Sequence, residues 1–180
     1  MYLRRLKEKD AFCMLEWMHD QEVVVHMAAD FMHMTIDDCL QFINKSNEDE
    51  SITLNRAVCT DSDEYLGTIS LKNISSLDSN AEYAIVLKRA AIGGGAAKFA
   101  TMEILKLAFD ELNLHKVYLY VRSSNIRAQK FYNKIGFRNE GVFLDHVKNK
   151  KGDFENLIWL ALLKDEFEEL SKKRSEDKNE

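Results

Sequence analysis

The chain has 180 residues, of which 46% are hydrophobic and 31% charged, and its formal net charge is −5 at pH 7. This length and composition predict one globular domain with a substantial core. They argue against non-specific nucleic-acid binding, and no apolar run approaches the roughly 18 residues that a membrane-spanning helix needs.

The first residues are predicted to form a strand and a helix. Apolar and polar residues alternate over residues 1–6, which predicts a strand. Asp10 is expected to cap a helix over residues 11–18, because a side-chain oxygen there can accept a free N–H of the first turn. The apolar face of this helix is expected to consist of Phe12, Leu15 and Met18.

Residues 19–34 are rich in Met, His and Phe, and their apolar residues follow neither the helical nor the strand period. Thr35 followed by Asp38 resembles a capping box, so a second helix is expected to run to about residue 44. Residues 52–59 and 65–71 are typical of two strands, and the acidic turn between them predicts antiparallel pairing.

The second half of the chain alternates strands and helices. We expect strands over residues 81–87 and 116–121, helices over 96–112 and 124–135, and final strands over 143–148 and 155–163. Gly136 stands where a helix C-terminus favours glycine. This order predicts a mixed α+β fold with three layers, in which helices cover both faces of one sheet. Residues 1–165 are expected to form the domain, followed by a charged, frayed tail over residues 166–180.

Three of the seven glycines stand together in Ile92-Gly93-Gly94-Gly95-Ala96-Ala97, between a predicted strand and a predicted helix. Glycines let an anion approach backbone N–H groups, and the helix N-terminus adds partial positive charge. Phosphate is therefore the predicted ligand, although a tight strand-to-helix corner explains the glycines equally well. The loop is not a Walker A loop, because no Lys-Ser or Lys-Thr pair follows it.

A second group of residues follows further along the chain. Asn125, Ala128 and Tyr132 recur at helical spacing and therefore share one helix face. Asn125, at the helix start, can bind either the backbone or a ligand. An N-cap asparagine, a packed alanine and a tyrosine at the core edge account for the same pattern.

The two motifs together resemble the GNAT superfamily of acyl-CoA-dependent N-acetyltransferases. The family's phosphate loop, Arg/Gln-x-x-Gly-x-Gly/Ala, is matched at Gly95 and Ala97. Its second signature, Asn-x-x-Ala-x-x-x-Tyr-x-x-x-Gly-Phe, is matched without a gap from Asn125 to Phe137.

Three further segments, residues 81–85, 111–117 and 142–163, resemble the RimJ/RimL-type branch of that superfamily. Two loop positions depart from the family pattern. Ile92 stands where Arg or Gln is usual, and Gly94 stands where a basic residue is common. The backbone N–H groups should still hold a pyrophosphate, with added charge from Arg89 or Lys98.

The resemblance implies a twisted, largely antiparallel sheet with one splayed parallel strand pair that admits acetyl-CoA, a co-substrate. Its pantetheine arm would bond strand backbone, and its pyrophosphate would lie on the glycine loop. The implied cofactor-binding residues are Ile85, Val86, Leu87, Ile92, Gly93, Gly94, Gly95, Ala96, Ala97, Asn125, Ala128 and Tyr132. No metal is expected, because the histidines share no metal-ligand spacing.

The resemblance also implies catalytic groups. Acetyl transfer to an amine needs a neutral amine and a proton for the departing thiolate. Tyr132 would be the general acid, because a phenol with an ordinary pKa of about 10 stays protonated at neutral pH. Glu82 would be the base, acting through water, and a solvent-facing or ion-paired strand residue is the equal alternative. Residues 17–34 would cover the acceptor.

The acceptor remains open among several amines. A small molecule (a polyamine, an amino acid or an amino-sugar nucleotide) is preferred over a protein N-terminus. The rival interpretations are a non-catalytic acyl-CoA-binding or regulatory domain, favoured by Ile92 and Gly94, and a generic nucleotide-binding protein. No nucleic-acid or membrane partner is expected, and self-association would give a homodimer. Three cysteines at no metal or redox spacing predict reduced thiols in a cytoplasmic protein.

Overall fold

The computed structural model describes residues 1–27 and 29–176. Its strands form one sheet of seven in the order β1-β2-β3-β4-β5-β7-β6. The strands are β1 (Tyr2–Arg4), β2 (Leu54–Cys59), β3 (Tyr65–Ser75), β4 (Asn80–Leu87), β5 (Lys116–Arg122), β6 (Arg138–Lys148) and β7 (Phe154–Leu163). Only β4 and β5 pair in parallel, and the other neighbours are antiparallel. The predicted mixed α+β architecture is therefore confirmed.

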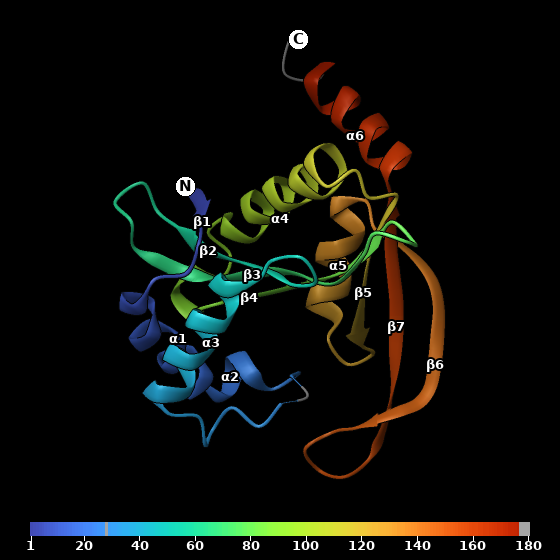
Figure 1. The fold of residues 1–180 in the computed structure, drawn as a ribbon. Helices are drawn as coiled ribbons and strands as arrows, with labels where there is room; N and C mark the ends of the chain where they lie inside the picture. Colours follow the sequence, from blue (N-terminus) through green and yellow to red (C-terminus); the bar gives the residue numbers. More distant parts are fainter. Residues whose placement is uncertain (28, 177–180) are drawn as a thin grey trace.

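The helices lie on both sides of this sheet (Figure 1). They are α1 (Ala11–Met18), α2 (Gln21–Val24), α3 (Ile36–Glu48), α4 (Ala96–Lys106), α5 (Ile126–Ile135) and α6 (Lys164–Glu176). Short 3-10 turns η1 (Glu8–Asp10) and η2 (Arg89–Ala91) precede α1 and the glycine loop, and the π-helical turn η3 (Leu107–Glu111) extends α4.

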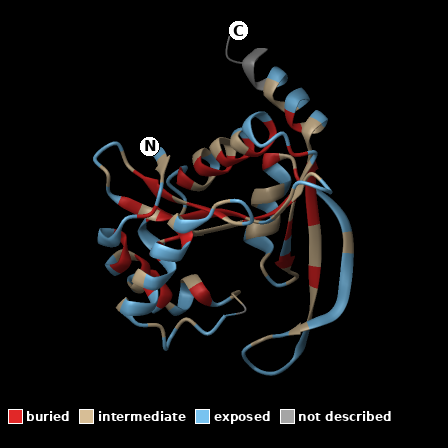
Figure 2. Cartoon of the chain, in the orientation of Figure 1, coloured by how far each residue is buried: buried red, intermediate tan, exposed pale blue. Residues whose placement is uncertain are grey.

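Two packed clusters form the core, one on each side of the sheet. On one side Trp17 and Ile43 of the N-terminal helices pack with Tyr65 of β3. On the other side Ile104 and Phe109 join the strands and the later helices. Buried residues follow the strands and the facing sides of the helices, whereas β6 is exposed along most of its length (Figure 2).

The start of α1 differs from the sequence prediction. Phe12 is 74% exposed, and the buried side chains are Ala11, Met14, Trp17 and Met18. Asp10 does not cap the helix through its side chain. Its buried carboxylate instead accepts from the Lys7 N–H at 2.9 Å and from both Arg4 Nη atoms at 2.7 and 2.8 Å. A buried charge needs such partners, and they occupy the carboxylate that was predicted to cap α1.

Other boundaries are confirmed or extended. Thr35 and Asp38 form the predicted capping box, and α3 continues past residue 44 to Glu48. α6 extends the helical part of the tail, and its Phe167 is buried in the core. The predicted frayed end falls partly on residues 177–180, which lie outside the described residues.

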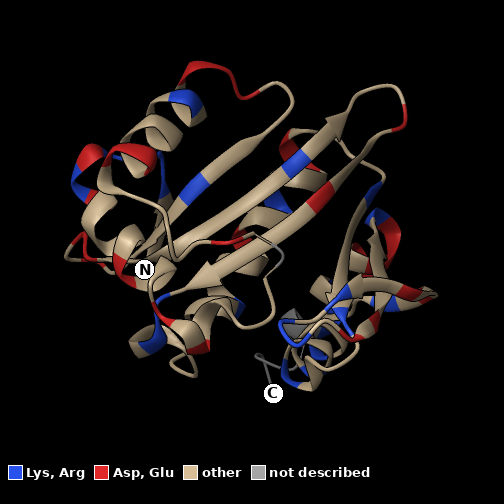
Figure 3. Cartoon of the chain, turned by 90° about the horizontal axis from the view of Figure 1, so that it is seen from below, with Lys and Arg blue, Asp and Glu red and all other residues tan. Residues whose placement is uncertain are grey.

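Charged residues of both signs are interspersed over the helices and strands in Figure 3. Within the described part of the chain, no helix combines the length and the apolar character needed to cross a membrane.

Candidate active site

β4 and β5 pair over only part of their length. The register consists of Asn80 with Lys116, Ala81 with Val117, and Glu82 with Tyr118. β4 then continues to Leu87 with its other edge paired to β3. Past Glu82, the register leaves the edge of β4 that faces β5 without a paired strand. Backbone N–H and C=O groups on such an edge require hydrogen-bond partners. The predicted cofactor residues Ile85 and Val86 lie on this open edge, which an extended ligand can join as a strand would.

The glycine loop leads from the end of β4 into α4. Gly93 and Gly95 have φ values of +91° and +86°, which side chains rarely adopt. A Cβ added to either would meet no atom within 4 Å, so the space beside the loop is open. Ala96, the first residue of α4, is buried, so its methyl group does not project into this space. The loop therefore offers backbone N–H groups and a helix N-terminus to an anion.

α5 begins and ends as the signature predicts. Asn125 is its N-cap, with Oδ1 accepting from the Ala128 N–H at 3.1 Å. Gly136 closes the helix with a φ of +125°. Among the described residues the Asn125 side-chain amide nitrogen has no hydrogen-bond partner. The Asn125 side chain therefore caps the helix through its oxygen and keeps its amide N–H groups free to donate.

Tyr132 lies on α5 against an aromatic cluster. Its ring centroid is 5.8 Å from that of Tyr83, with the rings edge to face, and it also packs on Phe131 and Phe137. The Tyr83 hydroxyl is bound to Thr101 at 2.8 Å, whereas the Tyr132 hydroxyl has no hydrogen bond within the described residues. Burial raises the pKa of Tyr132 above its ordinary value. Tyr132 is thus a protonated phenol with a free donor.

Glu82 lies at the last paired position of β4 and is only 7% exposed. Its carboxylate accepts from Lys72 Nζ at 2.8 Å and from Asn73 Nδ2 at 3.0 Å. Because side chains alternate along a strand, Glu82 and Tyr83 point to opposite faces. The gap between β4 and β5 past Glu82 therefore lets a ligand contact Glu82 on one face of the sheet and Tyr132, which packs on Tyr83, on the other.

An aromatic face, made of Tyr118, Tyr120, Phe143 and Trp159, borders Glu82. Trp159 stacks on Tyr118 with ring centroids 4.6 Å apart, and it contacts Tyr120 and Phe143 at 6.0 and 5.7 Å. Burial, and then the negative charge of Glu82, raises the pKa of both Tyr118 and Tyr120. Sequence reasoning missed this face, because it depends on the register that sets Tyr120 opposite Trp159.

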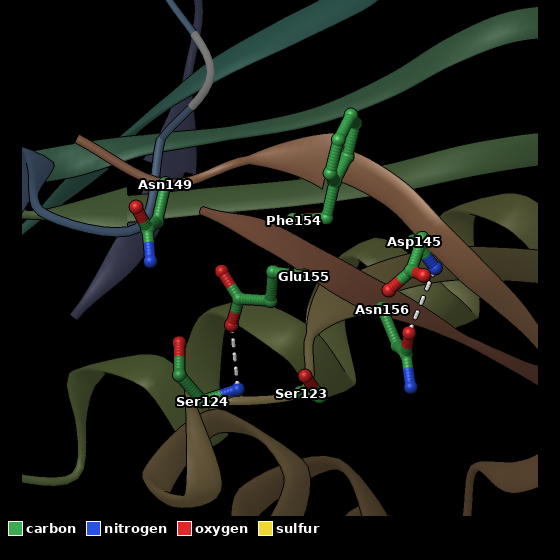
Figure 4. A pocket seen from close by; sticks show the side chains of 7 residues that line it. All are labelled: Ser123, Ser124, Asp145, Asn149, Phe154, Glu155 and Asn156. Carbon is green, nitrogen blue, oxygen red and sulfur yellow. Dashed lines mark hydrogen bonds between the residues drawn. The ribbon is translucent and has the colours of Figure 1, made fainter. Parts of the chain in front are cut away.

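The turn between β5 and α5 is held by Glu155. One carboxylate oxygen accepts from the Ser124 N–H at 2.7 Å (Figure 4). The other accepts from Arg122 at 3.1 Å. Gln129 adds a hydrogen bond to the Ser123 carbonyl at 2.8 Å. A polar hollow of about 480 Å³ lies here, beside the β6–β7 hairpin. These contacts fix the backbone directly before Asn125.

Charge near the glycine loop is arranged differently from the sequence expectation. Arg89 donates to Asp20 at 2.5 and 2.7 Å and lies 3.2 Å from Glu22, so its charge is already matched. A second arginine that the sequence prediction missed, Arg127, lines a cavity of about 280 Å³ together with Ile92 and Arg89. Lys98 is exposed in the first turn of α4.

These features fit acetyl-CoA: an unpaired strand edge for its amide-bearing arm, an open glycine loop for its phosphates, and a free phenol packed against Tyr83 of the same strand. The bound molecule supplies the activated acetyl group. Across the described residues, no group of three or more His, Cys, Asp or Glu side chains is arranged to hold a metal ion.

Comparison with known proteins supports this assignment. Residues 1–138 match the family described as "Acetyltransferase (GNAT) domain". The chain is 27% identical over 167 residues to the uncharacterized N-acetyltransferase p20 of Bacillus licheniformis, covering 92% of this chain and 93% of the relative. It is 30% identical over 104 residues to spermidine N(1)-acetyltransferase of Escherichia coli K12, covering 58% and 55% of the two chains.

Among solved structures, spermidine N-acetyltransferase from Vibrio cholerae in complex with CoA and spermine has a TM-score of 0.84. It is 22% identical, and the match covers 92% of this chain and 96% of that one. This likeness shows the fold, a mostly antiparallel sheet with one parallel strand pair. The chain belongs to the GNAT acetyltransferase family and is an N-acetyltransferase that uses acetyl-CoA.

Proposed function

We propose that residues 1–165, with α6 packed on them through Phe167, form one catalytic domain that transfers acetyl from acetyl-CoA to a primary amine of a polyamine. The observation that carries this proposal is the position of Glu82 and the aromatic face at the point where β4 and β5 separate. A carboxylate beside stacked aromatic rings favours an organic cation. The similarity to spermidine N-acetyltransferases supports the same acceptor class.

Charge distinguishes a polyamine from the other small amines. An amino acid carries a carboxylate and a nucleotide-linked sugar carries phosphates, and both would be repelled by Glu82. A polyamine presents only ammonium groups and methylene chains, which suit a carboxylate and aromatic rings respectively. The acceptor ammonium would displace Lys72, whose side chain is 41% exposed and can turn to solvent.

Each proton in the reaction has a proposed carrier. Glu82 takes the proton of the acceptor ammonium through a water molecule, which leaves a neutral amine. The amine nitrogen forms its bond to the acetyl carbon as the carbon–sulfur bond breaks, and the proton that the nitrogen then loses to become a neutral amide passes to water. Tyr132 gives its phenolic proton to the departing thiolate sulfur and recovers one from solvent.

The N-terminal segment is proposed to cover the acceptor. The Arg122 side chain donates to the carbonyl of His26 at 3.0 Å, which joins the loop after α2 to the end of β5. The three free cysteines support a reducing, cytoplasmic environment.

A protein N-terminus is the second candidate acceptor, and the segments that resemble the RimJ/RimL-type branch favour it. Peptides present a single ammonium on an extended backbone, so they would use Glu82 without needing the aromatic face. The two acceptors therefore differ in how they respond to changes at Tyr120.

The test compares kcat/KM for spermidine, spermine, an amino acid, an amino-sugar nucleotide and a peptide with a free N-terminus, measured by thiol release from acetyl-CoA. We expect the polyamines to be preferred. Tyr120→Leu should raise the KM for spermidine and leave the KM for acetyl-CoA unchanged. Phe154→Leu, a change at an exposed aromatic outside the aromatic face, is the control. A preference for the peptide that is indifferent to Tyr120→Leu would overturn the proposal.

A further inference from the structure

The glycine loop lacks a basic side chain of its own. Ile92 and Gly94 occupy positions where the family's pattern carries polar or basic residues. The coenzyme's pyrophosphate is doubly charged, and backbone N–H groups alone hold it less firmly than N–H groups aided by a cation. Besides Lys98 in the first turn of α4, a compensating charge can come from a neighbouring element.

Arg89 does not meet this need. Its guanidinium faces two carboxylates, with 2.5 Å to Asp20 and 3.2 Å to Glu22. The ion pair raises the pKa of Arg89 and lowers that of Asp20, so both groups remain charged at neutral pH. One cation against two anions leaves this side of the loop negative, which opposes a phosphate.

Arg127 lies where the missing charge is needed. It stands in the first turn of α5, two residues after the N-cap Asn125. Its side chain lines the same cavity as Ile92, Arg89 and Glu22, where it adds a second positive charge. Arg127 is exposed and forms no ion pair within the described residues. Its guanidinium is therefore free and borders the first position of the loop.

We propose that Arg127 contacts the pyrophosphate of CoA and replaces the basic side chain that the glycine loop lacks. α5 would then bind the coenzyme at two places, through Asn125 and Tyr132 toward the arm and through Arg127 toward the phosphates. A planar guanidinium suits this task because it can donate two parallel hydrogen bonds to phosphate oxygens.

The test measures equilibrium dissociation constants of the full chain by calorimetry for CoA, dephospho-CoA and pantetheine. Dephospho-CoA lacks only the 3′-phosphate, and pantetheine lacks all phosphates. Arg127→Ala should weaken CoA and dephospho-CoA equally, by about tenfold, because a charge-assisted hydrogen bond is lost. It should leave pantetheine affinity unchanged, and its binding of CoA should depend less on salt.

Lys130→Ala is the matched control, because it removes one positive charge from an exposed position of the same helix. It should bind all three compounds as the parent does. The melting temperature of both variants without ligand should match the parent, since neither side chain has a partner among the described residues.

Unchanged CoA affinity in Arg127→Ala would overturn the proposal. A loss for CoA without a loss for dephospho-CoA would also overturn it, because the contact would then be to the 3′-phosphate. An equal loss of CoA affinity in Lys130→Ala would overturn it as well, because the loss would then reflect the net charge of the protein and not a contact made by Arg127. These results are independent of the acceptor, so they do not depend on polyamine acetylation.

Discussion

At the residue scale, the hydroxyl of Tyr132 is the feature that most sharply distinguishes a catalytic role from packing. We predict that Tyr132→Phe lowers kcat by about a hundredfold, because general-acid assistance to the thiolate is lost. CoA affinity should change little, since the ring contacts remain. Tyr83→Phe is the control, because its hydroxyl is bound to Thr101 in the core. A Tyr132→Phe variant with parental kcat would remove Tyr132 as the acid.

The same hydroxyl predicts a pH dependence. Burial raises the pKa of Tyr132, so the phenol stays protonated above the ordinary tyrosine value of about 10. An acid whose pKa is raised loses its proton only at higher pH. Deprotonation of Tyr132 should therefore not lower kcat below about pH 10. The pH profile of kcat measures this directly. A fall in kcat near pH 8 that disappears in Tyr132→Phe would contradict the assignment.

Glu82 makes a separate prediction. Glu82→Gln should lower kcat/KM at neutral pH, because the acceptor then depends on its own small fraction of neutral amine. Activity should recover as pH rises toward the pKa of the amine, which a purely structural role would not produce. Lys72→Met is the companion variant, since it removes the competing ammonium and should lower the acceptor KM. Equal losses at every pH would assign Glu82 to structure.

At the element scale, the glycine loop is expected to act through its open space. Gly95→Val should abolish detectable CoA binding, because the side chain would fill the region that a phosphate needs. Gly152→Val is a matched control: Gly152 also has a positive φ, +89°, and a Cβ there would likewise meet no atom within 4 Å. Both changes carry the same backbone strain. Equal CoA affinity in the two variants would contradict the phosphate-loop assignment.

The β3–β4 pair is the support for the open edge of β4. A Cβ on Gly67 would lie 2.2 Å from the carbonyl oxygen of Val86 and 2.7 Å from the Leu87 Cα. Backbone atoms cannot move aside easily, so Gly67→Ala should lower the free energy of unfolding by about 2–3 kcal/mol. Gly141→Ala, with no atom within 4 Å, should change it by less than about 0.5 kcal/mol. Denaturant unfolding of the two variants measures the difference.

At the scale of the whole molecule, local signals predicted most elements. The Thr35 capping box and the Asn125 and Gly136 helix ends came from short-range chemistry, and the structure confirms all three. On α1 the prediction for Phe12 was wrong, whereas Met18 is buried and Leu15 packs against the core as expected. The ion pair between Arg4 and Asp10, which takes the carboxylate predicted to cap α1, is a contact between separate elements. Local spacing cannot contain such information.

The candidate site divides in the same way. The glycine loop and α5 are contiguous motifs, so their residues were identified from the chain. The ion pair of Glu82 with Lys72, the aromatic face and Arg127 depend on strand register and helix placement. The family is confirmed, and the RimJ/RimL-type branch stays a prediction.

The measurement that tests the central claim most directly is mass spectrometry of the amine products after incubation with acetyl-CoA and spermidine, together with thiol release. We predict singly acetylated spermidine and one equivalent of free CoA per acetyl group transferred, with both signals lost in Tyr132→Phe. CoA binding at parental affinity, with no acetylated product from spermidine or any other amine, would contradict the account and leave a non-catalytic acyl-CoA-binding domain.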